Sequence, residues 1–217
     1  FLQITQTKSK TFQDTTGKKQ YVCNNHNAFL SMMEGALTGK TGFTGEAGYC
    51  YVGAVRQGDR TLIVALLACG WPKNYKWADT KTLVQYGLDQ YGYCNYWEDA
   101  MQDQDIRILE AGKKRTVKDA PAKDGNLYQD GTVNTFLNID DQDREKRILM
   151  KKTEAIQVQI EEKQEITAPI ESGDILGTVT ILLNGETLDE KPIVSGESIQ
   201  KKNLLWIYRQ LWKSYAL

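Results

Sequence analysis

Hydrophobic and polar residues alternate over much of the first 70 positions, and this pattern predicts antiparallel strands. Residues 1–21 alternate loosely about the turn sequence Asp14-Thr15-Thr16-Gly17, which predicts a pair of exposed strands. The runs 43–55 and 61–67 are apolar and rich in β-branched residues, and the polar stretch 56–60 separates them. That arrangement is typical of a β-hairpin.

In the segment 75–91, apolar residues follow helical spacing instead of alternation. Asp79 and Thr80 are candidate caps, so an amphipathic helix is predicted. Its apolar residues are Trp77, Leu83, Val84, Tyr86, Gly87, Leu88 and Tyr91. We expect this helix to cover one face of the preceding sheet. The strands 43–69 carry apolar side chains on both faces, so the second face needs another partner. A short helical turn or loop is predicted over 28–34.

The character of the sequence changes around residues 92–101. From about 105 to 195, short strand-like runs alternate with polar turns; one run, 177–183, leads into the tight-turn pair Asn184-Gly185. This pattern predicts a separate, small all-β domain, and the region shows no cluster of candidate catalytic groups. The predicted divisions of the chain are 1–96, 97–197 and 198–217.

The last division, 198–217, is predicted to form an amphipathic helix. One stripe of that helix is apolar and aromatic, and it consists of Leu204, Tyr208, Leu211, Trp212 and Tyr215, with Leu205 beside it. The segment also carries four basic residues and no acidic one. A helix of this kind can lie in the plane of an anionic membrane surface, with its apolar stripe in the lipid and its basic residues near the headgroups. The alternative is an ordinary helix that packs on its own domain or on a partner.

Composition narrows the functional classes. The 217 residues include 27 Lys and Arg and 28 Asp and Glu, and this balance gives no indication of nucleic-acid binding. The longest apolar run, 61–69, has the length of a strand and is too short to span a membrane. The four cysteines lack C-x-x-C spacing and there is one histidine, so neither a metal site nor a cofactor is predicted. The chain starts at Phe1 without a signal-type segment, and we expect it to be a fragment or processed piece.

The candidate chemistry is concentrated in Lys40-Thr41-Gly42. In an extended strand, Lys40 and Gly42 share one face and Thr41 points to the other. The triplet puts an ammonium and a hydroxyl beside a glycine that another backbone can approach closely. A bare triplet of this kind also recurs by chance. A phosphate-binding loop is rejected, because its first glycine would have to stand at position 34, which is Glu34.

The wider context of the triplet resembles a known family. The segments that carry the resemblance are Asn25-His26-Asn27, Gly35-Ala36, 40–44 and 47–52. They resemble the serine D-alanyl-D-alanine carboxypeptidases, which are low-molecular-mass penicillin-binding proteins. The resemblance covers the whole chain but only the latter part of the family's length. It implies an α+β fold: the C-terminal half of a penicillin-binding/β-lactamase-like domain, then the family's small all-β domain and a C-terminal amphipathic helix.

The resemblance also implies a reaction and a set of site residues. A serine attacks the bond between two terminal D-alanines of a peptidoglycan stem peptide, and water then clears the acyl-enzyme. Lys40 is expected to hydrogen-bond the serine of the family's proton shuttle, and the backbone N–H of Phe43 to form half of an oxyanion hole. Substrate contacts are expected from Thr41, Gly42, Thr44 and His26. A purely structural role for His26 is left open.

The family's nucleophile motif, Ser-x-x-Lys, should precede Lys40, and the residues before Lys40 do not contain it. Ser198-Ile199-Gln200-Lys201 and Tyr93-Cys94-Asn95 match family motifs by chance, because both follow Lys40. We therefore expect a missing N-terminal segment, covalently linked or on a separate chain, to bring the serine and pack against the sheet.

The resemblance places the protein outside the cytoplasm, at the outer face of the cytoplasmic membrane. Its expected ligands are D-Ala-D-Ala peptides and β-lactam antibiotics, and its expected process is cell-wall and peptidoglycan biosynthesis, which sets cell shape. Residues 198–217 would then bind the membrane surface. The alternative function is a non-catalytic wall- or membrane-binding module with a degenerate half-site. A β-lactamase-type hydrolase is a further, less favoured alternative.

Overall fold

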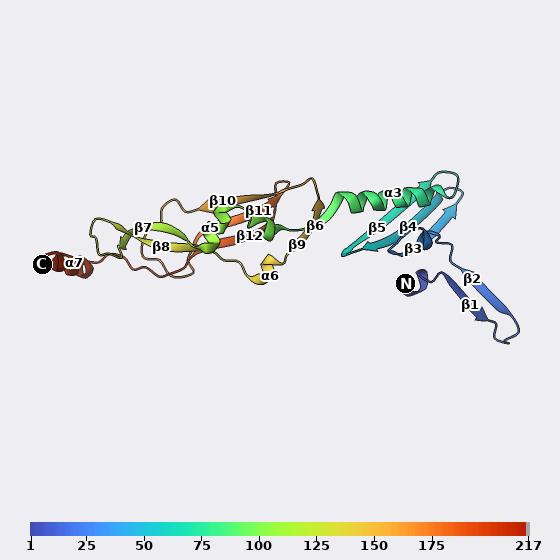
Figure 1. The fold of residues 1–217 in the computed structure, drawn as a ribbon, viewed down its shortest axis with the longest axis horizontal. Helices are drawn as coiled ribbons and strands as arrows, with labels where there is room; N and C mark the ends of the chain where they lie inside the picture. Colours follow the sequence, from blue (N-terminus) through green and yellow to red (C-terminus); the bar gives the residue numbers. More distant parts are fainter. Residues whose placement is uncertain (216–217) are drawn as a thin grey trace. The chain divides into compact units, whose positions relative to one another are not determined.

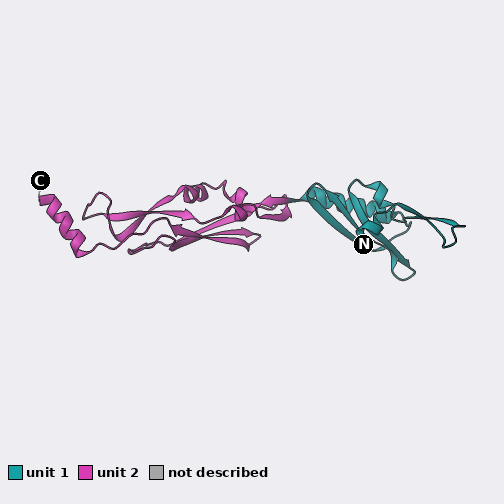
Figure 2. Cartoon of the chain, turned by 90° about the horizontal axis from the view of Figure 1, so that it is seen from below, with its two compact units in different colours: residues 1–92 teal, residues 93–217 magenta. Residues whose placement is uncertain are grey.

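The computed structural model describes residues 1–215, which divide into two compact units: unit 1, residues 1–92, and unit 2, which begins at residue 93 (Figure 2). Helices and antiparallel sheets make up unit 1, and unit 2 is dominated by strands. The predicted α+β class is therefore confirmed.

Unit 1 opens with a short helix and an exposed hairpin (Figure 1). Helix α1 (Leu2–Thr5) precedes β1 (Ser9–Gln13) and β2 (Gln20–Asn24), which pair antiparallel. Asp14 fixes the turn between the strands by accepting hydrogen bonds from the Lys18 and Lys19 N–H groups. The two exposed strands and their turn were predicted, whereas α1 was not.

The centre of unit 1 is a three-stranded antiparallel sheet with the order β3-β4-β5. Its strands are β3 (Ala36–Thr44), β4 (Gly48–Gln57) and β5 (Arg60–Cys69). The predicted turn between 55 and 61 is present as the tight β4–β5 connection. The predicted run 43–55 is wrong as a single strand, because the chain turns at residues 45–47 and Phe43 belongs to β3.

Helix α3 (Tyr75–Gln90) lies along one face of this sheet (Figure 1). Its buried positions include Trp77, Val84 and Leu88, which pack with Phe29, Tyr51, Val55 and Val64 into one core. Phe29 comes from the short helix α2 (Phe29–Met32), which lies within the helical turn predicted over 28–34. The predicted caps were wrong: α3 begins four residues before Asp79, and Asn74 stands at the N-cap position. Leu83 and Tyr86 are exposed and do not join the core.

The face of the sheet opposite α3 exposes large apolar side chains. Val52, Ile63 and Leu67 are 48%, 76% and 79% exposed, and they alternate with the core-facing residues of their strands. A contiguous row of exposed apolar side chains is unusual on the surface of a soluble monomeric protein. The predicted apolar character of both faces is therefore confirmed.

Unit 2 is built on a five-stranded antiparallel sheet with the order β10-β11-β12-β8-β7. The bounds of these strands are β7 (Lys113–Pro121), β8 (Asp130–Leu137), β10 (Ile156–Glu162), β11 (Ile175–Leu183) and β12 (Glu186–Ser195). The β11–β12 hairpin turns at Asn184-Gly185, where both residues have positive φ, as the tight-turn pair predicted.

Short helices and strands accompany this sheet. They are β6 (Tyr91–Asn95), α4 (Tyr96–Ala100), α5 (Gln104–Ala111), α6 (Asp141–Arg144) and β9 (Arg147–Lys151), and β6 pairs with β9. Trp97, Ile106 and Leu109 from α4 and α5 pack on Val179 and Ile181 of β11, and this is the main core of the unit.

A charged network joins α4, α6 and β12. Asp143 pairs with Lys146 at 2.7 Å and with Lys191, and Lys146 also reaches Asp189 at 3.1 Å. Asp189 accepts hydrogen bonds from the Trp97 indole at 3.1 Å and the Tyr96 hydroxyl at 3.2 Å. The two acids and two lysines therefore tie the buried aromatic residues of α4 to the sheet.

Helix α7 (Leu204–Tyr215) ends the described chain, and residues 216–217 of the predicted tail helix lie outside the described residues. Leu204, Tyr208, Trp212 and Tyr215 are exposed, whereas Trp206, Ile207 and Gln210 are partly covered. The predicted stripe is thus turned to solvent. None of the helices within residues 1–215 is long and apolar enough to cross a membrane.

The Asp143 pairs give unit 2 an acid-sensitive element. Hydrogen bonds from Lys146 and then Lys191 lower the pKa of Asp143 from 3.8 to about 2. Because the pKa of Asp143 is lower in the folded state than in the unfolded state, its ion pairs stabilise the folded state fully above about pH 4. This stabilisation is lost as the pH falls from about 4 to about 2. We expect Asp143→Asn to lower the melting temperature at pH 7 and to change it much less at pH 2.5. An equal loss at both pH values in thermal melts would contradict this assignment.

Candidate functional site

Four of the five predicted side-chain positions, together with Phe43, line one hollow at the open edge of β3. Its volume is about 760 Å³, and its lining includes His26, Lys40, Thr41, Gly42 and Phe43. β3 is an edge strand of its sheet, so backbone groups on its outer side are open to a partner. Thr44 does not line this hollow; its hydroxyl instead accepts a hydrogen bond from the Ala47 N–H in the β3–β4 turn.

The strand places Lys40 and Thr41 on opposite faces, as predicted. Lys40 lies opposite Val52, on the face that α3 leaves uncovered, and Thr41 lies opposite Tyr51, on the α3 side. The Lys40 ammonium is exposed and donates to the Thr41 carbonyl at 2.5 Å. Although they lie on opposite faces, Lys40 and Thr41 both line the hollow at the edge of β3.

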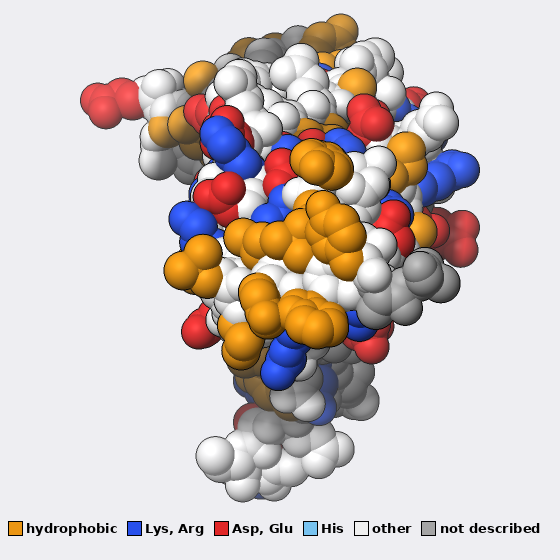
Figure 3. All heavy atoms as spheres, turned by 90° about the vertical axis from the view of Figure 1, so that its left-hand side faces the viewer, with side chains coloured by type: hydrophobic (Ala, Val, Ile, Leu, Met, Phe, Trp, Pro, Cys, Tyr) orange, Lys and Arg blue, Asp and Glu red, His pale blue; other side chains and the backbone are white. Residues whose placement is uncertain are grey.

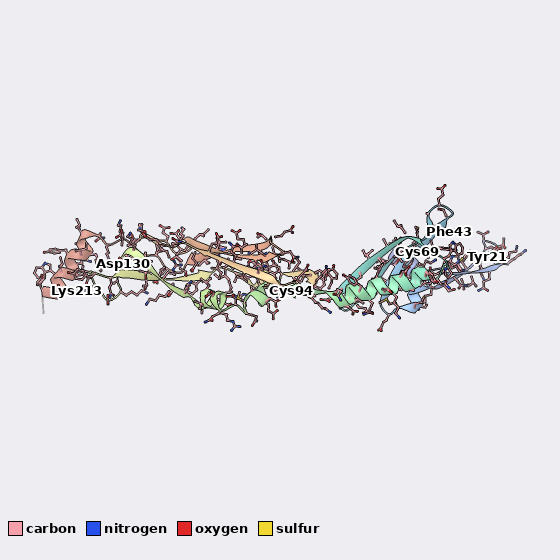
Figure 4. The ribbon with its side chains drawn as sticks, turned by 90° about the horizontal axis from the view of Figure 1, so that it is seen from above. Tyr21, Phe43, Cys69, Cys94, Asp130 and Lys213 are labelled. Carbon is pink, nitrogen blue, oxygen red and sulfur yellow. The ribbon has the colours of Figure 1, made fainter. Side chains whose placement is uncertain are left out.

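Gly42 leaves β3 open near the C-terminal end of the strand. A Cβ added there would meet only the Cys50 Cβ, at 3.9 Å, so the space above this glycine is free. A second extended chain can therefore approach the backbone closely. Phe43 follows, with its ring packed on Tyr49 at 4.5 Å between centroids; Figure 4 labels Phe43 and Cys69, which lie at the same end of the sheet.

Gly39 is required by the packing behind the site. A Cβ at residue 39 would lie 2.4 Å from the Tyr51 hydroxyl and 2.7 Å from Nδ2 of Asn27. A Cβ at Gly53 would meet the same hydroxyl at 2.4 Å. Two glycines on neighbouring strands thus make room for the phenol of Tyr51 beneath the Lys40-Thr41-Gly42 segment.

The first turn of α3 and the two residues before it supply side chains that were not predicted from the sequence. Lys73, Asn74, Lys76 and Trp77 complete the lining of the hollow. They follow Lys40 by more than thirty residues, and only the return of the chain through β4 and β5 brings them to β3. The Gly70-Trp71-Pro72 turn was the available signal, because it directs the helix start back to this end of the sheet.

The chemistry available in the hollow is cationic and hydrogen-bonding. Its lining offers lysine ammonium groups, the Thr41 hydroxyl and an imidazole, and within the described lining there is no carboxylate or serine. This arrangement can bind an anion, but it contains no nucleophile with a base. Residues 1–215 contain no group of three or more His, Cys, Asp and Glu side chains placed to hold a metal ion.

The two chance motif matches have structural roles in unit 2. The Ser198 hydroxyl accepts a hydrogen bond from the Ser172 N–H, and Lys201 pairs with Asp119 at 3.1 Å. Asn95 caps α4 by accepting from the Glu98 N–H. Burial, together with a hydrogen bond to Asp99, raises the pKa of the Cys94 thiol to about 12, which is the opposite of what a nucleophilic thiol requires.

Comparison with known proteins identifies relatives over most of the chain. Residues 144–201 match the family "Penicillin-binding protein 5, C-terminal domain". The chain is 26% identical over 202 residues to D-alanyl-D-alanine carboxypeptidase DacF of Bacillus subtilis, covering 93% of this chain and 46% of DacF. It is 32% identical over 100 residues to D-alanyl-D-alanine carboxypeptidase DacB2 of Mycobacterium tuberculosis, covering 46% of this chain and 28% of DacB2.

Among solved structures, that of the D-alanyl-D-alanine carboxypeptidase DacD from Francisella tularensis gives a TM-score of 0.43 at 22% identity, covering 88% of this chain and 45% of that chain. The chain spans less than half the length of each of these curated relatives. The predicted resemblance to a C-terminal portion of the D-alanyl-D-alanine carboxypeptidases is confirmed.

Substitution of the two glycines of β3 by alanine should affect the stability of the fold differently. Gly39→Ala should lower the melting temperature strongly, because its Cβ would overlap Tyr51 and Asn27; overpacking of this kind costs about 1–3 kcal/mol. Gly42→Ala meets no close atom and is the matched control, with little expected change. Equal melting temperatures for the two variants would contradict the packing described.

Proposed function

We propose that this chain forms one wall of the active site of a serine-type D-Ala-D-Ala carboxypeptidase. The observation that carries the proposal is the hollow at the open edge of β3, where Lys40, Thr41, Gly42 and Phe43 meet. The sequence relatives are carboxypeptidases of this name, and the hollow offers the cations and hydroxyl that a peptide carboxylate would need.

The reaction is acyl transfer to a serine that lies outside these residues. The serine oxygen bonds to the carbonyl carbon of the penultimate D-alanine, the C–N bond breaks, and the terminal D-alanine leaves with the proton. Water then attacks the ester, which releases the shortened peptide and restores the serine. In β-lactams the amide of the strained ring takes the place of the scissile peptide.

Each predicted residue that lines the hollow has one task in this scheme, and Thr44 has none. The Lys40 ammonium hydrogen-bonds the shuttle serine and makes the site attractive to anions. Thr41 donates its hydroxyl to the terminal carboxylate, and His26 contributes at the rim of the same hollow. Gly42 allows the peptide to lie along β3, and the Phe43 N–H stabilises the oxyanion, a contribution of about 3 kcal/mol per donor.

The serine is proposed to arrive on an N-terminal segment that packs on the uncovered face of the sheet. Val52, Ile63 and Leu67 form an apolar surface there, and Lys40 points to the same side. A segment that covered this surface would lie beside Lys40. Its binding would be stabilised by about 25 cal/mol for each Å² of apolar surface that it buried. The segment is either continuous with this chain or a separate chain.

Unit 2 is proposed to carry a membrane contact. Figure 3 looks onto the end of unit 2 that carries α7 and shows hydrophobic side chains gathered there with Lys and Arg side chains beside them. The exposed stripe of α7 fits insertion at the interface of an anionic bilayer. We place the protein at the outer face of the cytoplasmic membrane, where peptidoglycan stem peptides are available. The same stripe would serve a non-catalytic membrane-binding module.

The role of Lys40 is tested by acylation of the native protein with a fluorescent penicillin. Lys40→Ala should slow acylation by about 100-fold, because the serine that transfers the proton would lose its hydrogen-bonding partner. The fold should be unaffected, because Lys40 is exposed and its described hydrogen bond is to the neighbouring Thr41 carbonyl. Lys10→Ala, on an exposed strand away from the hollow, is the control. Unchanged acylation in Lys40→Ala would favour the binding-module alternative.

The membrane role of α7 is tested by liposome flotation with vesicles that contain anionic lipid. Trp212→Asp should reduce binding by about tenfold or more, since it removes a large apolar side chain from the exposed stripe. Ser214→Asp adds the same charge two residues away, off the stripe, and should have a smaller effect. Equal loss in the two variants would indicate a charge effect alone, and no loss in either would contradict the anchor.

A further inference from the structure

The loop between β7 and β8, residues 122–129, exposes an aromatic side chain at the end of unit 2 that carries α7. Tyr128 of this loop is 96% exposed, which is more than any residue of the α7 stripe. Figure 4 labels Asp130, the first residue of β8, and Lys213 of α7 at the same end of unit 2. Because water solvates an aromatic ring poorly, burial of the Tyr128 ring against a partner would be favourable.

The loop is a structured turn that holds the Tyr128 ring in place. The Gly125 N–H donates to the Ala122 carbonyl at 3.0 Å. The side chains of Asp124 and Asn126 accept hydrogen bonds from the N–H groups of Asn126 and Tyr128, each at 2.9 Å. These bonds order the backbone that leads to the ring, so little backbone entropy would be lost when the ring is buried against a partner.

Helix α7 is attached to this loop. A Cβ added at Gly125 would lie 2.6 Å from Oε1 of Gln210, so the Gln210 side chain rests on the loop. Just before the helix, the Lys202 ammonium donates to the Gln129 carbonyl at 2.8 Å and to Asp130 Oδ1 at 3.0 Å. Gln210 belongs to the partly covered side of α7, so these contacts leave the apolar stripe exposed. The loop and the helix are thereby held together as one surface.

The charges around this surface favour an anionic bilayer as the partner. The two acids at the base of the loop, Asp119 and Asp130, are each paired with a lysine of the segment that leads into α7. The loop itself carries one lysine and one acid. Residues 198–217 contain no acid, and Arg209 and Lys213 of α7 are exposed. Exposed aromatic rings beside cations are typical of surfaces that bind anionic lipid.

We propose that the β7–β8 loop is a second membrane contact, in which the Tyr128 ring lies among the lipid headgroups beside α7. Tyrosine is enriched at this depth, because its ring is apolar and its hydroxyl can stay hydrated. A helix that lies alone in the interface allows the attached domain to rotate about the helix axis. A second contact beside the helix restricts this rotation and so limits the tilt of unit 2 on the bilayer. This inference rests on the proposed membrane role of α7.

The test is flotation of the native protein with vesicles of equal parts phosphatidylglycerol and phosphatidylcholine. Tyr128→Ser should weaken binding by about fivefold, because the apolar ring is lost from the interface. Tyr128→Trp should bind at least as well as the native protein, since tryptophan also favours the interface. Added salt should leave the effect of Tyr128→Ser unchanged, because the contact of the ring is apolar.

The matched control is Tyr93→Ser, the same substitution at another exposed tyrosine of unit 2. Tyr93 precedes Cys94, which Figure 4 labels at the other end of unit 2 from Lys213. Tyr93→Ser should therefore float like the native protein. Thermal melts of the two Tyr128 variants should match that of the native protein, because this side chain lies in water.

The possible outcomes separate this inference from the membrane role of α7. If the native protein floats and Tyr128→Ser floats equally well, the loop is no membrane contact and the role of α7 stands. If Tyr93→Ser or Tyr128→Trp loses as much binding as Tyr128→Ser, insertion of the Tyr128 ring is likewise overturned. If the native protein does not float, the membrane role of α7 fails and the loop contact fails with it.

Discussion

The packing of Tyr51 under β3 is the constraint on which the rest of the site depends. The phenol occupies a space that exists only because Gly39 and Gly53 lack side chains. Tyr51 in turn packs edge-on against Trp77 at 5.0 Å and against Phe29 at 6.0 Å, so it connects β4 to both α3 and α2. One side chain therefore fixes the edge strand, the helix start and the approach to the hollow relative to one another.

This packing explains why the site has two differently placed cations. Lys40 projects from the face that α3 leaves open, where a further segment can reach it, and Lys76 projects from the helix that covers the other face. The edge of β3 lies between them, with Gly42 exposed for a peptide. A peptide laid along that edge would lie between the two ammonium groups.

The sequence was sufficient to predict the strands, the main helix and the position of the Lys40-Thr41-Gly42 segment, because alternation and helical spacing are local signals. It failed where local signals were weak or misleading. Residues 43–55 read as one apolar run because Gly45-Glu46-Ala47 is a short turn between apolar strands. Asp79 and Thr80 resemble caps, but Thr80 is buried one turn into α3 and bonds the Lys76 carbonyl. Lys76 could not be predicted, since only the tertiary fold places it beside Thr41.

The central claim is that residues 1–217 hold one wall of a penicillin-reactive site and the serine comes from elsewhere. The most direct test is to label the native protein with fluorescent penicillin, digest it, and identify the modified peptide by mass spectrometry. We predict a single labelled serine that lies outside residues 1–217, with labelling dependent on Lys40. A label on any residue within 1–217, or no label on the native protein, would contradict it.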